Sequence, residues 1–87
     1  MKEIKMIPVE SSQIESIGYD EDLNELFVEF KKGKVYRYTD VPKTIYHEFL
    51  ESTESFGTFF SKRIKGEFDY ELLNVLVDDR LYLTIDN

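Results

Sequence analysis

The fold of this chain is decided by the stretch from Leu26 to Pro42, which reads LFVEFKKGKVYRYTDVP. Apolar side chains recur at every second position, at Leu26, Val28 and Phe30, a period typical of a half-buried strand. The KKGK segment at 31–34 supplies polar residues and a glycine for a tight turn, and the proline ends the second run. The stretch therefore predicts a β-hairpin, and the rest of the chain must cover one of its faces.

The register of this hairpin decides what Tyr36 and Tyr38 can do. If the connection is a three-residue loop with a glycine bulge, Val28 lies opposite Tyr36, and both tyrosines belong to the apolar face as core residues. If it is a two-residue turn, Glu29 lies opposite Tyr36, and both tyrosines form a platform on the other face. We favour the bulged register because it keeps Arg37 off the apolar face and gathers large side chains in a small core.

Three strands and two helices account for the middle of the chain. Pro42 suits the first position of one helix, Ser55 can cap a second, and Gly66 can end it. We predict an α+β fold, with a three-stranded antiparallel β-meander, two short helices packed on one face, and a possible extra C-terminal strand. The expected strands lie near 14–20, 25–31 and 34–40, and the expected helices near 42–51 and 55–65.

The two ends of the chain are less regular. The first residues alternate weakly and contain Pro8, which confines a strand to a sheet edge, so we expect a frayed lead-in. Beyond Tyr70, the residues 71–77 fit either a helix or a strand, whereas the alternation of Leu81, Leu83 and Ile85 favours a terminal strand. The predicted limits are a lead-in at 1–8, one domain at 9–70 and a C-terminal extension at 71–87.

Charge is distributed unevenly along the chain. The net charge is −7, and residues 10–29 carry seven carboxylates and no base. Residues 31–43 carry five bases against Asp40, and a second basic cluster follows at 62–65. An acidic protein repels phosphate, which argues against non-specific nucleic-acid binding, so any contact with an anion should be local to the basic hairpin.

No residue pattern points to catalysis, a cofactor or a metal. There is no cysteine, His47 is the only imidazole, and neither Ser11 nor Ser12 stands in a nucleophile motif. We therefore expect a non-enzymatic module without a cofactor. No apolar run approaches the roughly 20 residues of a membrane helix, and the start lacks a signal peptide, so we expect a cytoplasmic protein with no membrane partner.

The order of several short motifs resembles the KTSC domain, a small module named for its place at the C-terminus of some lysyl-tRNA synthetases and also found alone in bacteria. Its mark is a Y-x-Y triplet, here Tyr36-Arg37-Tyr38. The resemblance covers about residues 9 to 70 and implies RNA binding as one possible role, although the function of the family is not established. The other matching residues are Val9, Ser11, Ser12, Ile14, 17–20, Phe30, Gly33, Val41, Pro42, Ser55, Gly57, Phe59, Phe60, Ile64 and Lys65.

Two functional hypotheses follow from these observations. The first is a module for protein interaction or self-association that uses exposed aromatic residues and the apolar tail. The alternative is weak binding of single-stranded RNA, in which tyrosines stack on bases and cations contact phosphates. The candidate contacts for either partner are Lys31, Lys32, Lys34, Tyr36, Arg37 and Tyr38.

Overall fold

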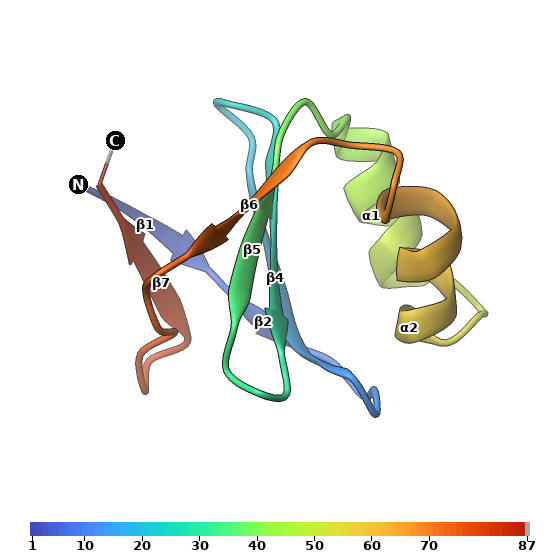
Figure 1. Ribbon diagram of the computed structural model, residues 1–87, viewed down its shortest axis with the longest axis horizontal. Coiled ribbons are helices and arrows are strands. Elements are labelled where there is room, and N and C mark those ends of the chain that lie inside the picture. Colours follow the sequence, from blue (N-terminus) through green and yellow to red (C-terminus); the bar gives the residue numbers. More distant parts are fainter. Residues whose placement is uncertain (87) are drawn as a thin grey trace.

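The computed structural model describes residues 1–86 and shows an α+β fold built on one five-stranded antiparallel sheet (Figure 1). The strand order is β2-β3-β4-β5-β6, and a separate two-stranded sheet pairs β1 with β7. The predicted three-stranded meander is the centre of this wider sheet. The elements are β1 Lys2–Lys5, β2 Ile7–Pro8, β3 Ile14–Asp20, β4 Glu25–Phe30, β5 Val35–Tyr38, α1 Lys43–Glu51, α2 Phe56–Phe59, the π-helical turn η1 Phe60–Ile64, β6 Tyr70–Leu73 and β7 Tyr82–Ile85.

Both faces of the central sheet are covered. Figure 1 shows α1 and α2 on one side of the sheet and the β1–β7 pair on the other. Leu26 and Val28 of β4 point toward the helices and join a core that includes Phe49. The intervening Phe27 points the other way and packs with Leu83 of β7 in a second core. Burial on both faces explains why β4 contains consecutive apolar residues.

The hairpin adopts the bulged register. Val28 lies opposite Tyr36, as that register requires. The loop is closed by a bond from the Phe30 amide to the Lys34 carbonyl (2.9 Å), and the Gly33 amide donates to the Phe30 carbonyl (2.8 Å). Gly33 has φ +94°, a conformation that side chains with a Cβ rarely adopt. The prediction of a glycine bulge is therefore confirmed.

The expectation of a frayed N-terminal lead-in is wrong. β1 pairs along its length with β7, with Ile4 opposite Leu83, and β2 adds an edge strand beside β3. Ile4 and Met6 are buried. Local sequence could not reveal this pairing, because the partner strand lies about 80 residues away and each strand is short. The expected C-terminal strand is confirmed as β7. The segment 71–77, for which the sequence fitted either a helix or a strand, begins within the strand β6.

The helices follow the predicted ranges with one change at each. Pro42 precedes α1 in an extended conformation instead of forming its first residue. The Ser55 hydroxyl caps α2 by accepting the Thr58 amide at 3.1 Å, and Gly66 ends the second helical segment with φ +82°. Its last turn is π-helical, since the Lys65 amide donates to the Phe60 carbonyl. Among residues 1–86 none of the helices combines the length and apolar character needed to cross a membrane.

Candidate functional site

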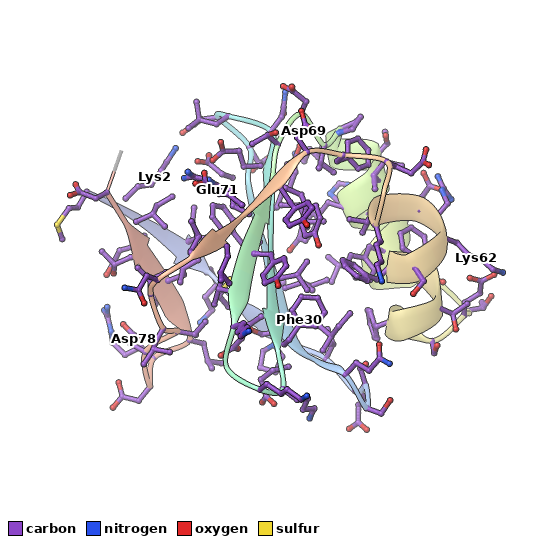
Figure 2. All side chains as sticks on the ribbon, viewed as in Figure 1. Lys2, Phe30, Lys62, Asp69, Glu71 and Asp78 are labelled. Carbon is purple, nitrogen blue, oxygen red and sulfur yellow. The ribbon has the colours of Figure 1, made fainter. Side chains whose placement is uncertain are left out.

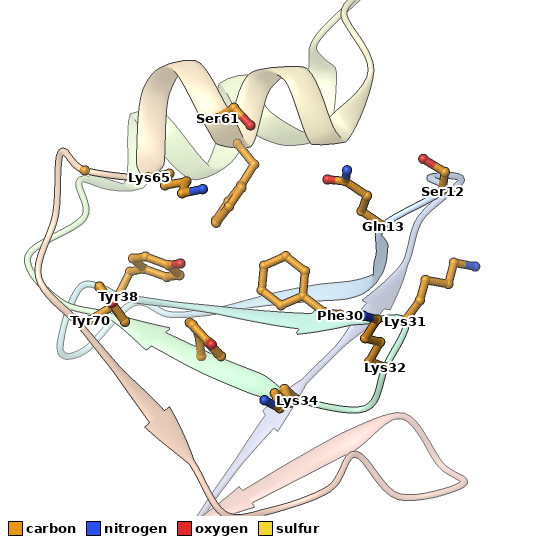
Figure 3. A pocket seen from close by; sticks show the side chains of 13 residues that line it. Ser12, Gln13, Phe30, Lys31, Lys32, Lys34, Tyr38, Ser61, Lys65 and Tyr70 are labelled. Atoms are coloured by element: carbon orange, nitrogen blue, oxygen red, sulfur yellow. The ribbon is translucent and has the colours of Figure 1, made fainter.

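A groove of about 710 Å³ lies between the sheet and the second helical segment, and we call it the aromatic groove (Figure 3). The sheet and the 31–34 loop form its floor and one wall, while η1 lies above it. This volume is in the range of ordinary ligand pockets. The lining residues are Ser12, Gln13, Phe30, Lys31, Lys32, Lys34, Tyr36, Tyr38, Phe60, Ser61, Lys65, Gly66 and Tyr70.

Five aromatic rings in mutual contact line the aromatic groove. Tyr36 and Tyr70 stack almost parallel, with ring centroids 5.6 Å apart and 6° between the planes. Tyr38 lies 5.6 Å from Tyr70, and Phe60 contacts Tyr38 edge-on at 5.7 Å. Phe30 bridges the two sides through edge contacts with Tyr36 and Phe60. Edge-to-face and offset contacts of this kind hold aromatic side chains in fixed orientations, so the floor is preorganised.

The π-helical turn brings the upper wall of the groove into place. A π-turn inserts one extra residue per turn and occurs often at functional sites. Here it spans Phe60–Ile64, so that the buried Phe60 and Ile64 hold the turn on the core while Ser61 lines the groove. Lys65 and Gly66 follow directly and complete the wall. Figure 3 shows the side chains of Ser61 and Lys65 entering from this side.

The charge around the aromatic groove is positive, although the whole chain carries −7. Four lysines line it, and none of its lining residues, all within 1–86, carries a carboxylate. Lys31 pairs with Glu15 at 3.3 Å. The other three, Lys32, Lys34 and Lys65, make no ion pair with a described residue. The groove therefore combines aromatic rings with lysines that carry no counter-ion from the described residues, a combination whose chemistry suits anions that also contain flat apolar groups.

The structure brings together five of the six candidate contacts and separates the sixth. Arg37 points to the opposite face of the sheet, where its Nε donates to Glu71 at 3.0 Å and a guanidinium nitrogen lies 4.0 Å from Glu25. Figure 2 places Glu71 near Lys2, on the side of the sheet away from Phe30. Neighbouring residues of a strand point to opposite faces, so the basic hairpin does not present a single cationic surface.

The two tyrosines of the Y-x-Y triplet differ in burial. Tyr38 is 3% exposed and belongs to the core, as the bulged register predicts. Tyr36 is only half-buried and presents part of its ring to the groove. The alternative of a platform on the opposite face is therefore wrong. The prediction of core residues is confirmed for Tyr38, whereas Tyr36 is only half-buried because the space between the sheet and η1 is only partly filled.

The burial of Tyr38 has a measurable consequence at high pH. Burial, with a smaller contribution from Tyr36 and Tyr70, raises the pKa of Tyr38 from 10.0 to about 12. The folded state is therefore stabilised below pH 10, and this contribution is lost as the pH rises from 10 toward 12. We expect urea unfolding to show less loss of stability over this interval in Tyr38→Phe than in the parent protein. Equal losses would contradict the assignment.

Sequence reasoning missed several residues of the groove. The sequence marked Phe30 only as an apolar residue of the hairpin, Phe60 only as a residue that matches the KTSC domain, and Lys65 only as part of the basic cluster at 62–65. Tyr70 was overlooked because it opens the segment that fitted either a helix or a strand. Its spacing of two from Leu72 is a strand signal, which β6 bears out. Gln13 and Ser61 carry no sequence signal, because only the packing of η1 over the sheet brings them near the groove.

Within the apolar tail at 71–87, the alternating residues of β7 are not an exposed surface. Leu83 is 0% exposed and Ile85 is 4% exposed, and both pack in the second core. Their alternation reflects a strand with one buried face. Exposed apolar side chains lie instead on and after the edge strand β6, at Tyr70, Leu72 and Leu76.

Comparison with known proteins assigns the chain to a family by sequence. The model of the KTSC domain matches residues 10–68. The lysine–tRNA ligase of Trichormus variabilis is 39% identical over 69 residues, which are 79% of this chain but only 12% of the ligase. The chain thus spans about an eighth of the length of that relative. An uncharacterized protein of Stutzerimonas stutzeri is 37% identical over 64 residues, 74% of this chain and 89% of its own length.

A solved structure agrees with this assignment. The crystal structure of a KTSC domain protein from Yersinia pestis superposes with a TM-score of 0.77 and 37% sequence identity, covering 80% of this chain and 97% of the other. The family match includes β3, β4, β5 and both helical segments, and it ends two residues before Tyr70. The chain belongs to the KTSC domain family.

Proposed function

We propose that the aromatic groove binds single-stranded RNA weakly. The observation that carries this proposal is a groove lined by five aromatic rings and four lysines, with no carboxylate among its lining residues, in an acidic protein. Stacking of a base on an aromatic side chain contributes about 1–3 kcal/mol and tolerates any sequence. Lysine contacts to phosphate add affinity that depends on salt.

The relatives support the same choice of ligand. A lysine–tRNA ligase, by its name, acts on an RNA, and the matched segment is a small part of it. An accessory RNA contact is a role that such a small part could have. The binding chemistry of this chain, however, rests on its own groove.

The expected affinity is modest. At physiological salt the screening length is about 8 Å, so distant carboxylates interfere little with the groove lysines. With three or four phosphate contacts, the slope of log affinity against log salt should be about −2 to −3, and binding at about 150 mM salt should be micromolar or weaker.

Fluorescence anisotropy with a labelled single-stranded RNA of mixed sequence tests the proposal. We expect Tyr70→Ala to lower affinity roughly 5- to 150-fold, the equivalent of one lost stacking contact. Lys32→Glu and Lys65→Glu should weaken binding and reduce the magnitude of the salt slope by about one each.

Lys43→Glu is the matched control for these charge reversals. It makes the same change in net charge, but Lys43 lies outside the groove and pairs with Glu21. Its effect should be small. If Lys43→Glu weakened binding as much as Lys32→Glu, the groove would not be the site. If no RNA bound even at about 20 mM salt, where screening is weak, the proposal would be overturned.

A protein partner or self-association is the second candidate function. The observation that favours it is the edge strand β6, which carries the exposed Tyr70 and Leu72 at the end of the strand order. Unpaired sheet edges accept an added strand. Sedimentation of the free protein over a range of concentrations tests self-association, and Leu72→Glu should then reduce it without affecting RNA binding.

A further inference from the structure

We infer that Ser12, Gln13 and Ser61 contact ribose 2′-hydroxyl groups, so that this protein binds RNA more tightly than DNA of the same sequence. This inference rests on the proposed function and adds a subsite to it. It starts from a second hollow of about 490 Å³, which we call the hydroxyl trough. The trough is lined mainly by serine and threonine hydroxyls and the Gln13 amide.

The hydroxyl trough continues the aromatic groove. Ser12, Gln13 and Ser61 line both hollows and therefore form their junction. Figure 3 shows Ser12 and Gln13 at one end of the groove and Ser61 on the helix above. A strand whose bases stack on the rings must pass this junction if it continues toward the trough.

The junction side chains have unused hydrogen-bonding capacity. Elsewhere in the trough, Ser11 accepts the amides of Gln13 and Ile14, and Ser55 bonds to Thr58. The side chains of Ser12, Gln13 and Ser61 are exposed, and they make no hydrogen bond to another residue within 1–86. A serine hydroxyl both donates and accepts, and so does a glutamine amide.

Gly57 gives the Gln13 side chain its place in the trough. A Cβ at position 57 would lie only 3.3 Å from Gln13 Oε1, so the missing side chain leaves the amide room. The trough contains no aromatic ring and one lysine, Lys62, which pairs with Glu54 at 3.1 Å. The hydroxyl and amide groups of the trough therefore suit contacts with the sugar, whereas the rings and the lysines without ion pairs lie in the aromatic groove.

RNA differs from DNA by the ribose 2′-hydroxyl, the group that the side chains of this junction can bind. The 2′-hydroxyl is both a donor and an acceptor, and proteins use it to distinguish the two nucleic acids. One or two net hydrogen bonds, at about 1 kcal/mol each, correspond to a preference for RNA of about five- to thirtyfold.

The test compares oligouridine with oligodeoxyuridine of about ten nucleotides at low salt, because these two strands differ only at the 2′ position. We expect the RNA to bind about five- to thirtyfold more tightly. The double variant Gln13→Ala/Ser61→Ala leaves only Ser12 at the junction, so it should lower the ratio toward one, chiefly by weakening RNA binding. A 2′-O-methyl oligouridine should bind the parent protein nearly as weakly as the DNA.

Tyr70→Ala is the control, because it removes stacking but leaves the junction intact. It should weaken both strands equally and preserve the ratio. Equal binding of RNA and DNA by the parent protein, or a ratio unchanged in the double variant, would overturn the inference and leave the groove as the binding site. Failure of both strands to bind would overturn the proposed function itself.

Discussion

Replacement of Leu83 by aspartate should abolish cooperative folding. Leu83 is 0% exposed and lies in the second core, opposite Ile4 of β1. Removing a buried leucine side chain alone costs about 2–5 kcal/mol, and burying a carboxylate without a partner costs more. Domains of this size are stabilised by roughly 4–13 kcal/mol in total, so the loss should consume most of the stability. Circular dichroism during urea unfolding measures it.

Leu76→Asp is the matched control for this change. Leu76 lies in the same C-terminal part of the chain but is 76% exposed. Exposed substitutions usually change stability by no more than about 0.5 kcal/mol. A cooperative transition in Leu83→Asp at the urea concentration of the parent protein would show that β7 is not part of the core.

Replacement of Gly18 by valine should have the second-largest effect on stability. A Cβ at this position of β3 would lie 2.5 Å from the sulfur of Met6 and 2.9 Å from the backbone oxygen of Lys5. Met6 is fully buried and a backbone oxygen cannot rotate away, so β1 would have to move off the sheet. We expect a loss of about 3 kcal/mol or more, at the upper end of overpacking penalties.

Glu15→Val is the control for the valine substitution. Glu15 lies on the same strand, but its side chain is exposed, so the change should alter stability by about 0.5 kcal/mol at most. The same urea midpoint for Gly18→Val and the parent protein would rule out the close approach of β1 to β3. A lower urea midpoint for Gly18→Val but not for Glu15→Val would support the close approach of β1 to β3, which only a residue without a side chain at position 18 allows.

Both ends of the chain add strands to the segment that matches the KTSC domain. The match covers residues 10–68, yet β1, β2, β6 and β7 lie outside it. β6 widens the sheet and supplies Tyr70, which stacks on Tyr36 in the groove. β1 and β7 cover the face opposite the helices and bury Phe27 and Val35. The extensions therefore complete both the aromatic groove and a core.

The sequence by itself determined the local elements of this protein. Alternating apolar residues and the KKGK turn defined the hairpin of β4 and β5, and Pro42, the cap at Ser55 and Gly66 marked the limits of the two helical segments. The bulged register was favoured because it gathers large side chains on one face and keeps Arg37 off that face, and this register places Tyr36 and Tyr38 on the face toward the helices. These features depend on residues that are close in the chain, so their signals are local.

Only the tertiary structure decided what these elements form together. The pairing of β1 with β7 joins segments about 80 residues apart, and neither strand is distinctive alone. Arg37 lies beside Glu71 on one face of the sheet because neighbouring residues of a strand point to opposite faces. Lys65 lines the aromatic groove together with Tyr36 on the other face, because the π-turn places it there. The groove without carboxylates exists because long-range packing places η1 against the sheet. The order of charges along the chain does not depend on that packing, so it could not predict the groove.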